Sequence, residues 1–241
     1  MARVVVIGQS GTGKSYYTGA LLEQTVPAFD LAVHYDIEDE ERGLSDVHND
    51  PIYQSLFVEA DRARQLDWIQ VIGNHRKLRV IPEEMTVEEM QELYAVICQC
   101  VLHICKNLAT KLTGFVSCDE AHNLVPQNAF DRRVERLITG GRKHGVECLH
   151  ISQRPQLLHT TVISQADRRI YFRVNDDNDL SKINKMSGFN ALNELPKLED
   201  RTCIIENKST GDWTVLDTNT VTRQRPHYSQ DDGIVDEHLP I

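Results

Sequence analysis

The chain has 241 residues and a formal net charge of −10, which suits one large α/β domain, alone or with appendages. The negative charge argues against a wholly basic nucleic-acid clamp, although a local basic channel stays possible because local potential and total charge are separate matters. No stretch reaches the roughly 20 apolar residues of a membrane span, and the six cysteines lack the spacing of a zinc site or redox pair. We therefore expect no transmembrane segment, and buried thiols in a reducing compartment.

The first predicted elements are a strand, a glycine-rich loop and a helix. Residues 3–7 are strand-like, and the stretch after residue 15 suits a helix. Between them stands the G-x-x-x-x-G-K-[ST] pattern, whose backbone N–H groups cradle a polyphosphate. Lys14 should reach the β- and γ-phosphates of ATP, and the Ser15 hydroxyl should bind Mg²⁺; a chance glycine turn is the alternative. The predicted nucleotide site comprises Gly8, Gln9, Ser10, Gly11, Thr12, Gly13, Lys14, Ser15 and Tyr16.

Beyond residue 24, predicted strands alternate with predicted helices, a pattern typical of an α/β fold with a mostly parallel central sheet flanked by helices. Strands are expected at residues 31–36, 55–58, 78–82, 114–120, 146–153 and 169–174. Helices are expected at residues 60–73, 86–112, 130–144 and 179–186. In the first helix Leu66, Ile69 and Ile72 should face inward, and Thr86 with Glu89 forms a capping box for the second.

The end of the chain changes character. A polar turn between residues 202–206 and 212–216 predicts a C-terminal β-hairpin. After it the sequence is polar and lacks periodicity. We expect one domain at residues 1–217 and a polar tail at residues 218–241 that is an arm or disordered.

Polar residues follow several predicted strands at their carboxyl ends, which share one edge of a parallel sheet. Asp119 would hold Mg²⁺ directly or through water, and Glu120 would orient and partly deprotonate the attacking water; capping of the next helix is the alternative for both. Asp36 is a second carboxylate for the water or metal, or a strand-end cap. Gln153 touches the γ-phosphate or its water, or caps a turn. His122 suits a structural or linking role better than metal binding.

Several arginines are candidates for an arginine finger, a residue supplied to a neighbouring subunit's γ-phosphate. Arg142 lies in a glycine-flanked basic turn, where the helix dipole alone would also favour a cation. The competing candidates are Arg132, Arg133, Arg136 and Arg154. If the chain forms a ring, candidate pore residues are His75, Arg76, Lys77 and Arg79, or Arg132 with Arg133; a solvated face is the alternative for both groups.

Three motifs give the chain a resemblance to a known superfamily. Residues 140–146 are similar to G-R-K-x-G-[VL], residues 151–156 to [ST]-Q-R-P, and residues 163–165 to a valine-x-x-Q segment before a strand. In this order they resemble the FtsK–HerA superfamily of ring-forming, DNA-pumping ATPases, over about residues 2–217. The resemblance implies a RecA-like P-loop NTPase core, with Glu120 as catalytic carboxylate, Asp36 as supporting acid, Gln153 as sensor and Arg142 as the finger acting in trans.

The layout departs from two branches of that superfamily. The β-barrel domain of cellular HerA proteins and the membrane and DNA-reading domains of FtsK proteins have no counterpart in the sequence. What remains looks like the small genome-packaging ATPases of membrane-containing archaeal or bacterial viruses. The resemblance implies a homo-oligomer, usually a hexamer, that pumps double-stranded DNA without sequence preference. It also implies a capsid vertex or membrane-associated virion protein as partner, and a cytoplasmic or virion-associated location without secretion.

Two alternatives to this function stay open. One is a HerA-type cellular or plasmid DNA translocase that lacks its barrel domain. The other is an ATP-dependent assembly or switch protein that does not move DNA.

Overall fold

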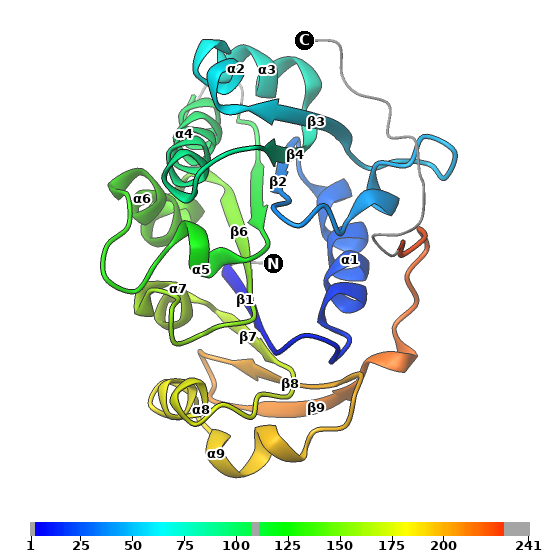
Figure 1. Cartoon of the computed structure of the whole chain (residues 1–241), viewed down its shortest axis with the longest axis vertical. Helices are drawn as coiled ribbons and strands as arrows, with labels where there is room; N and C mark the ends of the chain where they lie inside the picture. The colour runs from blue at the N-terminus through cyan, green and yellow to red at the C-terminus, as the bar shows by residue number, and fades with distance from the viewer. Residues whose placement is uncertain (1–2, 108–110, 229–241) are drawn as a thin grey trace.

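A computed structural model of the chain describes residues 3–107 and 111–228, and a nine-stranded sheet runs through this part (Figure 1). Its strand order is β3-β4-β2-β5-β6-β1-β7-β8-β9. The strands from β3 to β7 pair in parallel, whereas β8 pairs antiparallel with both β7 and β9. The strands are β1 (Arg3–Ile7), β2 (Leu31–Tyr35), β3 (Gln54–Glu59), β4 (Lys77–Glu83), β5 (Gly114–Cys118), β6 (Val146–Ser152), β7 (Arg168–Tyr171), β8 (Thr202–Asn207) and β9 (Trp213–Asp217). The predicted α/β fold, mostly parallel sheet and C-terminal hairpin are therefore confirmed.

Helices cover both faces of the sheet, with α1 on one side and α4, α6 and α7 on the other (Figure 1). The helices are α1 (Lys14–Thr25), α2 (Ala60–Gln65), α3 (Trp68–His75), α4 (Val87–Cys105), α5 (Ala121–Leu124), α6 (Arg132–Gly140), α7 (Thr160–Gln165), α8 (Asp177–Asn184) and α9 (Ala191–Glu194). Short 3₁₀ helices occupy Val26–Ala28, Arg42–Leu44, Gly141–His144, Leu195–Lys197 and Thr218–Thr220.

The apolar run of β1 shows why two cores form. Val5 and Ile7 pack into the larger core beneath α4 and α6, whereas Val4 and Val6 pack into the smaller core beneath α1. Successive side chains of a strand point to opposite faces, so a strand buried on both sides is apolar throughout.

Two predicted helices have different bounds. The helix expected at residues 60–73 is divided into α2 and α3, because the Asp67 side chain accepts the N–H groups of Ile69 and Gln70 and starts a new helix. As a result Trp68, Val71 and Ile72 form the buried face of α3, while Ile69 is 44% exposed and Leu66 is half-buried. The capping box of α4 is confirmed, but α4 ends at Cys105. Part of its predicted end, residues 108–110, lies outside the described residues.

Other differences come from elements too short to show a period. The helices α7 and α9, of six and four residues, were not expected. The helix expected at residues 130–144 begins after the Asp131 cap and changes to a 3₁₀ turn, which Gly145 ends at φ 71°.

No helix among the described residues is long and apolar enough to cross a membrane. All six cysteines are free, and Cys100 differs from the others in being only half-buried.

The structure contradicts the prediction that Arg79, a residue of β4, lines a pore. Its side chain is fully buried (0% exposed), so DNA in a central channel cannot reach it. The guanidinium donates to Asp36 at 2.8 Å and to Asp39 at 2.6 Å, and to the hydroxyls of Ser45 and Ser55 at 3.0 and 3.1 Å. The parallel pairing of β2 with β4 places Arg79 beside the carboxyl end of β2. Arg79 therefore ties the loop after β2 to the sheet.

We expect Arg79→Met to lower the free energy of unfolding by about 3–5 kcal/mol, because Asp36 then stays buried without its counter-charge. Urea denaturation with linear extrapolation measures the change. The control is Arg62→Ala, which removes an exposed arginine of α2 and should change stability by no more than about 0.5 kcal/mol. A loss below about 1 kcal/mol for Arg79→Met would mean that the ion pair contributes little to the fold.

Candidate nucleotide site

The phosphate loop, residues 8–15, joins β1 to α1 and is anchored on two neighbouring segments. The N–H of Gly8 donates to the carbonyl of Ser152 at 3.3 Å, and that of Gln9 to the carbonyl of Arg173 at 3.2 Å. Gly11 and Gly13 have φ values of 78° and 92°, in the left-handed region that glycine adopts without steric cost. The loop borders a cavity of about 340 Å³, whose lining consists of Gln9, Ser10, Gly11, Gly13, Lys14, Ser15, Tyr16, Glu40, Gln153, Arg201 and His227.

The predicted strand-end residues meet at one edge of the sheet. Asp36 follows β2, Asp119 and Glu120 follow β5, Gln153 follows β6 and the phosphate loop follows β1. These four parallel strands are consecutive neighbours in the sheet, in the order β2-β5-β6-β1. The topology therefore brings the predicted residues together as the alternation of strands and helices indicated.

Glu120 is held in place from two sides. Gln153 Nε2 donates to Glu120 Oε1 at 2.6 Å, and His122 Nδ1 lies 3.1 Å from Glu120 Oε2. The Glu120 backbone has φ 38° and ψ 41°, a left-handed conformation that costs energy for a residue with a side chain and often occurs at functional sites. His122 therefore has the linking role that the sequence suggested.

The environment changes the proton affinity of both groups. Burial raises the pKa of Glu120, and the positive charge of Lys14 and the hydrogen bond from Gln153 only partly offset this effect. Burial, with the charges of Arg154 and Lys14, lowers the pKa of His122 to about 4. The His122 ring is therefore neutral at pH 7, and its 3.1 Å contact with Glu120 is not an ion pair. A carboxylate with a raised pKa is suited to accept a proton from water near neutral pH.

Oxygen ligands suitable for Mg²⁺ lie beside the phosphate loop. The Ser15 hydroxyl donates to Glu40 Oε2 at 2.7 Å. The Asp119 oxygens accept the N–H groups of Ile37 at 2.7 Å and Glu38 at 3.2 Å, and burial together with the charge of Asp36 raises the Asp119 pKa well above its usual value. The described residues contain no group of three or more His, Cys, Asp or Glu side chains that could hold a metal. A hydroxyl with one or two carboxylates still fits Mg²⁺, which keeps several waters and binds substrate phosphates.

Glu40 is a member of the site that the sequence did not single out, as are Arg201 and His227 of the cavity lining. It belongs to the acidic run at residues 37–41, where several carboxylates follow one another without periodicity. Its contact with Ser15 depends on how the loop folds back from β2, so the only signal in the sequence was the run itself.

Asp36 caps the end of β2. The sequence left two roles open for it, a ligand of the water or metal and a strand-end cap, and its geometry is that of the cap. Its oxygens accept the N–H groups of Glu40 at 3.1 Å and Glu41 at 3.0 Å, in addition to the ion pair with Arg79. Burial would raise the pKa of Asp36, but the charge of Arg79, its hydrogen bond and the other lowering effects of the surroundings together outweigh burial, and the net pKa lies below its usual value. The side chain is 0% exposed and cannot touch a nucleotide. Asp36 therefore acts on the site by holding the loop that carries Glu40.

Arg142 lies at the amino end of β6, whereas the phosphate loop of the same chain lies at the carboxyl ends of the parallel strands. It precedes β6, whereas Gln153 follows it, and the seven residues of that strand span about 23 Å. Its side chain is 65% exposed, with Asp167 at 3.8 Å. Among the competing arginines, Arg133 pairs with Asp131 and Glu92, while Arg154 lines a cavity of about 390 Å³ with Gln9 and Gln153. Arg142 is thus exposed to solvent and cannot reach the phosphate loop of its own chain.

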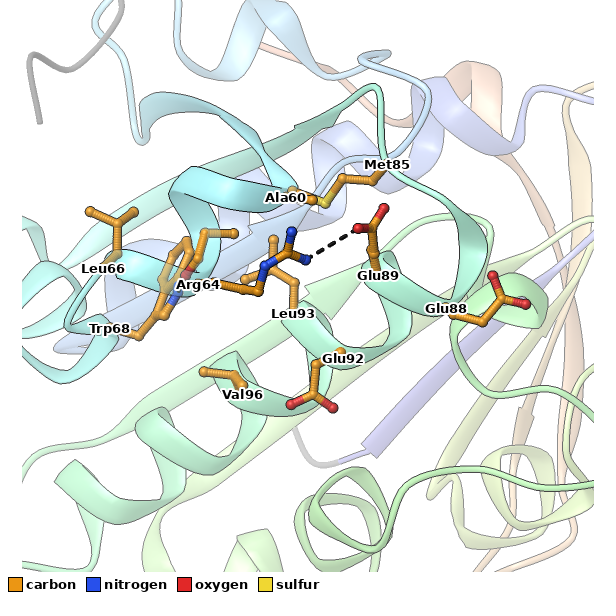
Figure 2. A pocket seen from close by; sticks show the side chains of 11 residues that line it. Ala60, Arg64, Leu66, Trp68, Met85, Glu88, Glu89, Glu92, Leu93 and Val96 are labelled. Atoms are coloured by element: carbon orange, nitrogen blue, oxygen red, sulfur yellow. Dashed lines mark hydrogen bonds and ion pairs between the residues drawn. The ribbon is translucent and has the colours of Figure 1, made fainter.

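A third cavity, of about 410 Å³, lies between α2, α3 and α4 (Figure 2). Its lining is mainly apolar, with Trp68, Leu93 and Val96, and Arg64 pairs with Glu89 across it. This groove borders the β3–β4 edge of the sheet and contains none of the predicted site residues. We assign it no part in nucleotide chemistry.

Comparisons with known proteins bear on the fold. No protein-family model matches the chain. A curated protein named as a probable helicase, from Methanocaldococcus jannaschii, is 27% identical over 178 residues, which make up 70% of this chain and 31% of that protein. The chain therefore spans less than a third of the length of the curated relative that it matches.

Two solved structures have a similar fold. The genome packaging NTPase B204 of Sulfolobus turreted icosahedral virus 2, in complex with AMPPCP, has a TM-score of 0.62 at 16% identity over 89% of this chain and 96% of that chain. The cytoplasmic domain of the Type VII secretion ATPase EccC of Thermomonospora curvata has a TM-score of 0.52 at 17% identity over 89% of this chain and 25% of that chain. At these identities the likeness shows the fold, which is that of a P-loop NTPase and consistent with a RecA-like core.

We expect Gln153→Ala to raise the pKa of Glu120 further, because it removes a hydrogen bond that favours the ionised carboxylate. Carboxyl-carbon NMR titration of glutamate-labelled protein measures the pKa, and Glu120→Gln identifies the resonance. Gln156→Ala, an exposed amide three residues away, should leave the titration unchanged. An unchanged or lower Glu120 pKa in Gln153→Ala would show that the Gln153 contact does not control this carboxylate.

Proposed function

We propose that the chain is an ATPase that pumps double-stranded DNA, and that it serves as a viral genome-packaging motor. The observation that carries the proposal is the grouping of the phosphate loop, Glu120 and Gln153 on three adjacent parallel strands. This grouping supplies a polyphosphate cradle, a proton acceptor and an amide that contacts it. The likeness to the genome packaging NTPase B204 and to the probable helicase supports the same class of activity.

In the proposed reaction, loop N–H groups and Lys14 hold the β- and γ-phosphates. Water attacks the γ-phosphorus, the bond to the β-phosphate oxygen breaks, and Glu120 accepts the proton of the water. Mg²⁺, when bound by Ser15 with Asp119 or Glu40, neutralises charge that develops on the phosphates. Glu120 must turn from Gln153 toward the water, which frees the Gln153 amide to contact the γ-phosphate. Gln153 thereby senses whether that phosphate is present.

A homo-oligomer completes the site in this proposal. The phosphate loop and Arg142 lie at opposite ends of the parallel strands of one chain. A head-to-tail ring would therefore place the Arg142 of one copy at the γ-phosphate of the next. We propose a hexamer, located in the cytoplasm or virion, that contacts DNA mainly through its phosphates and docks on a capsid vertex or membrane-associated virion protein. The likeness to a probable helicase keeps a HerA-type cellular or plasmid translocase as the second candidate.

We expect duplex DNA to raise the ATP hydrolysis rate of the wild type, and the stimulation to fall between roughly 50 and 200 mM salt because phosphate contacts release counterions. Arg142→Ala should lower the rate about 1,000-fold or more, as loss of an arginine finger does. An equimolar mixture of Arg142→Ala and Glu120→Gln should regain up to about a quarter of the wild-type rate, because random pairing across a head-to-tail interface restores that share of intact sites.

The control for this experiment is Arg62→Ala, an exposed arginine that lines neither cavity beside the phosphate loop, and this variant should behave as the wild type does. Labelled subunits must be shown to exchange between assemblies. If exchanging variants show no rescue, the two residues do not share a site between subunits. A rate that DNA leaves unchanged, from a protein that forms no ring, would favour the ATP-dependent switch or assembly protein.

A further inference from the structure

The segment after β9 reaches the nucleotide cavity. Residues 221–228, here called the arm, run alongside α1 after the 3₁₀ helix Thr218–Thr220 (Figure 1, orange to red). The sequence suggested that this region is an arm or disordered; its remainder, residues 229–241, lies outside the described residues. His227 of the arm lines the same cavity as the phosphate loop. None of the predicted site residues belongs to this segment.

Buried polar contacts hold the arm. Arg223 pairs with Glu41 at 2.8 Å, and the two side chains are only 1% and 4% exposed. The Glu23 carboxylate on α1 accepts the N–H groups of Gln224 at 2.7 Å and Arg225 at 2.6 Å. A carboxylate that receives two backbone N–H groups fixes the path of the chain as well as its position. The arm is therefore seated on α1 and on the loop after β2.

Two glycines leave the space that the arm fills. A Cβ atom on Gly19 would lie 2.0 Å from Arg223 Nη1, and a Cβ on Gly43 would lie 1.8 Å from the Pro226 carbonyl oxygen. Gly19 lies inside α1, where glycine stabilises a helix less than alanine does. A glycine at such a position is usually explained by the close approach of another segment. The seated arm gives that reason for both glycines.

The arm sets the orientation of two rings in the cavity. The N–H of Arg223 donates to the Tyr16 hydroxyl at 3.3 Å, and the Tyr16 and His227 rings are perpendicular, with centroids 6.1 Å apart. Arg223 Nη1 lies 3.1 Å from His227 Nδ1. A guanidinium can only donate, so this Nδ1 accepts and the neutral ring carries its hydrogen on Nε2. Burial and the charge of Arg223 lower the pKa of His227, which keeps the ring neutral at pH 7.

We propose that Tyr16 and His227 bind the base of the nucleotide whose phosphates occupy the phosphate loop. Two perpendicular rings form a corner in which a flat base stacks on one ring and presents its edge to the other. The Nε2–H of His227 supplies a donor for the acceptor nitrogens of a base. This inference rests on the proposed function, because it requires a nucleoside triphosphate at the phosphate loop. It adds that the arm, and not the P-loop core alone, recognises the nucleoside.

The test compares ATP with inorganic tripolyphosphate, which has the phosphates but no base. Isothermal titration calorimetry with Mg²⁺ present measures both affinities. His227→Ala and Gly19→Ala should each weaken ATP binding about tenfold, the size of one lost base-stacking contact, and leave tripolyphosphate binding unchanged. Lys14→Ala should weaken both ligands. Gly73→Ala is the matched control, since a Cβ on this helical glycine of α3 meets nothing within 4 Å.

The outcomes separate this inference from the proposed function. If the wild type binds neither ligand, both are wrong. If the wild type binds ATP but His227→Ala binds it equally well, or loses both ligands in parallel, the base subsite is wrong and the proposed function stands. Should Gly19→Ala fail to fold, His227→Ala decides the matter alone, because His227 belongs to neither hydrophobic core.

Discussion

The buried ion pair between Arg79 and Asp36 is the constraint on which the site depends. Both side chains are removed from solvent, and such a pair is tolerated only when further hydrogen bonds satisfy its remaining groups. Ser45, Ser55 and Asp39 supply them to the guanidinium, and backbone N–H groups of the loop after β2 supply them to Asp36. The pair therefore fixes the loop at residues 36–41 as a rigid part of the sheet edge.

That loop connects three parts of the molecule. Glu40 contacts Ser15 of the phosphate loop, the N–H groups of Ile37 and Glu38 contact Asp119, and Glu41 pairs with Arg223 of the arm. The four loop residues that make these contacts lie within five consecutive positions of the chain. Metal binding at Ser15 would compete with the Ser15–Glu40 hydrogen bond, so the position of Glu40 couples the nucleotide site to the loop and, through Glu41, to the arm.

The sequence predicted the central strands and the meeting of the strand-end residues at one edge of the sheet, because the phosphate-loop pattern and the alternation of strands with helices depend on local chemistry. It did not predict the partner of Asp36. Arginines are mostly exposed, and the burial of Arg79 follows from the pairing of β2 with β4, which no local pattern shows. Glu40 could not be told from its acidic neighbours for the same reason. The seating of the arm depends on Gly19, whose role appears only when distant segments are packed together.

Hydrogen exchange in Arg79→Met tests most directly whether the ion pair organises this edge. If it does, amides at residues 37–41 and 223–225 lose more protection than those of β6, which is separated from β4 by two strands and reports the change in global stability. A loss of protection that is equal in the loop, the arm and β6 would contradict this role for the ion pair.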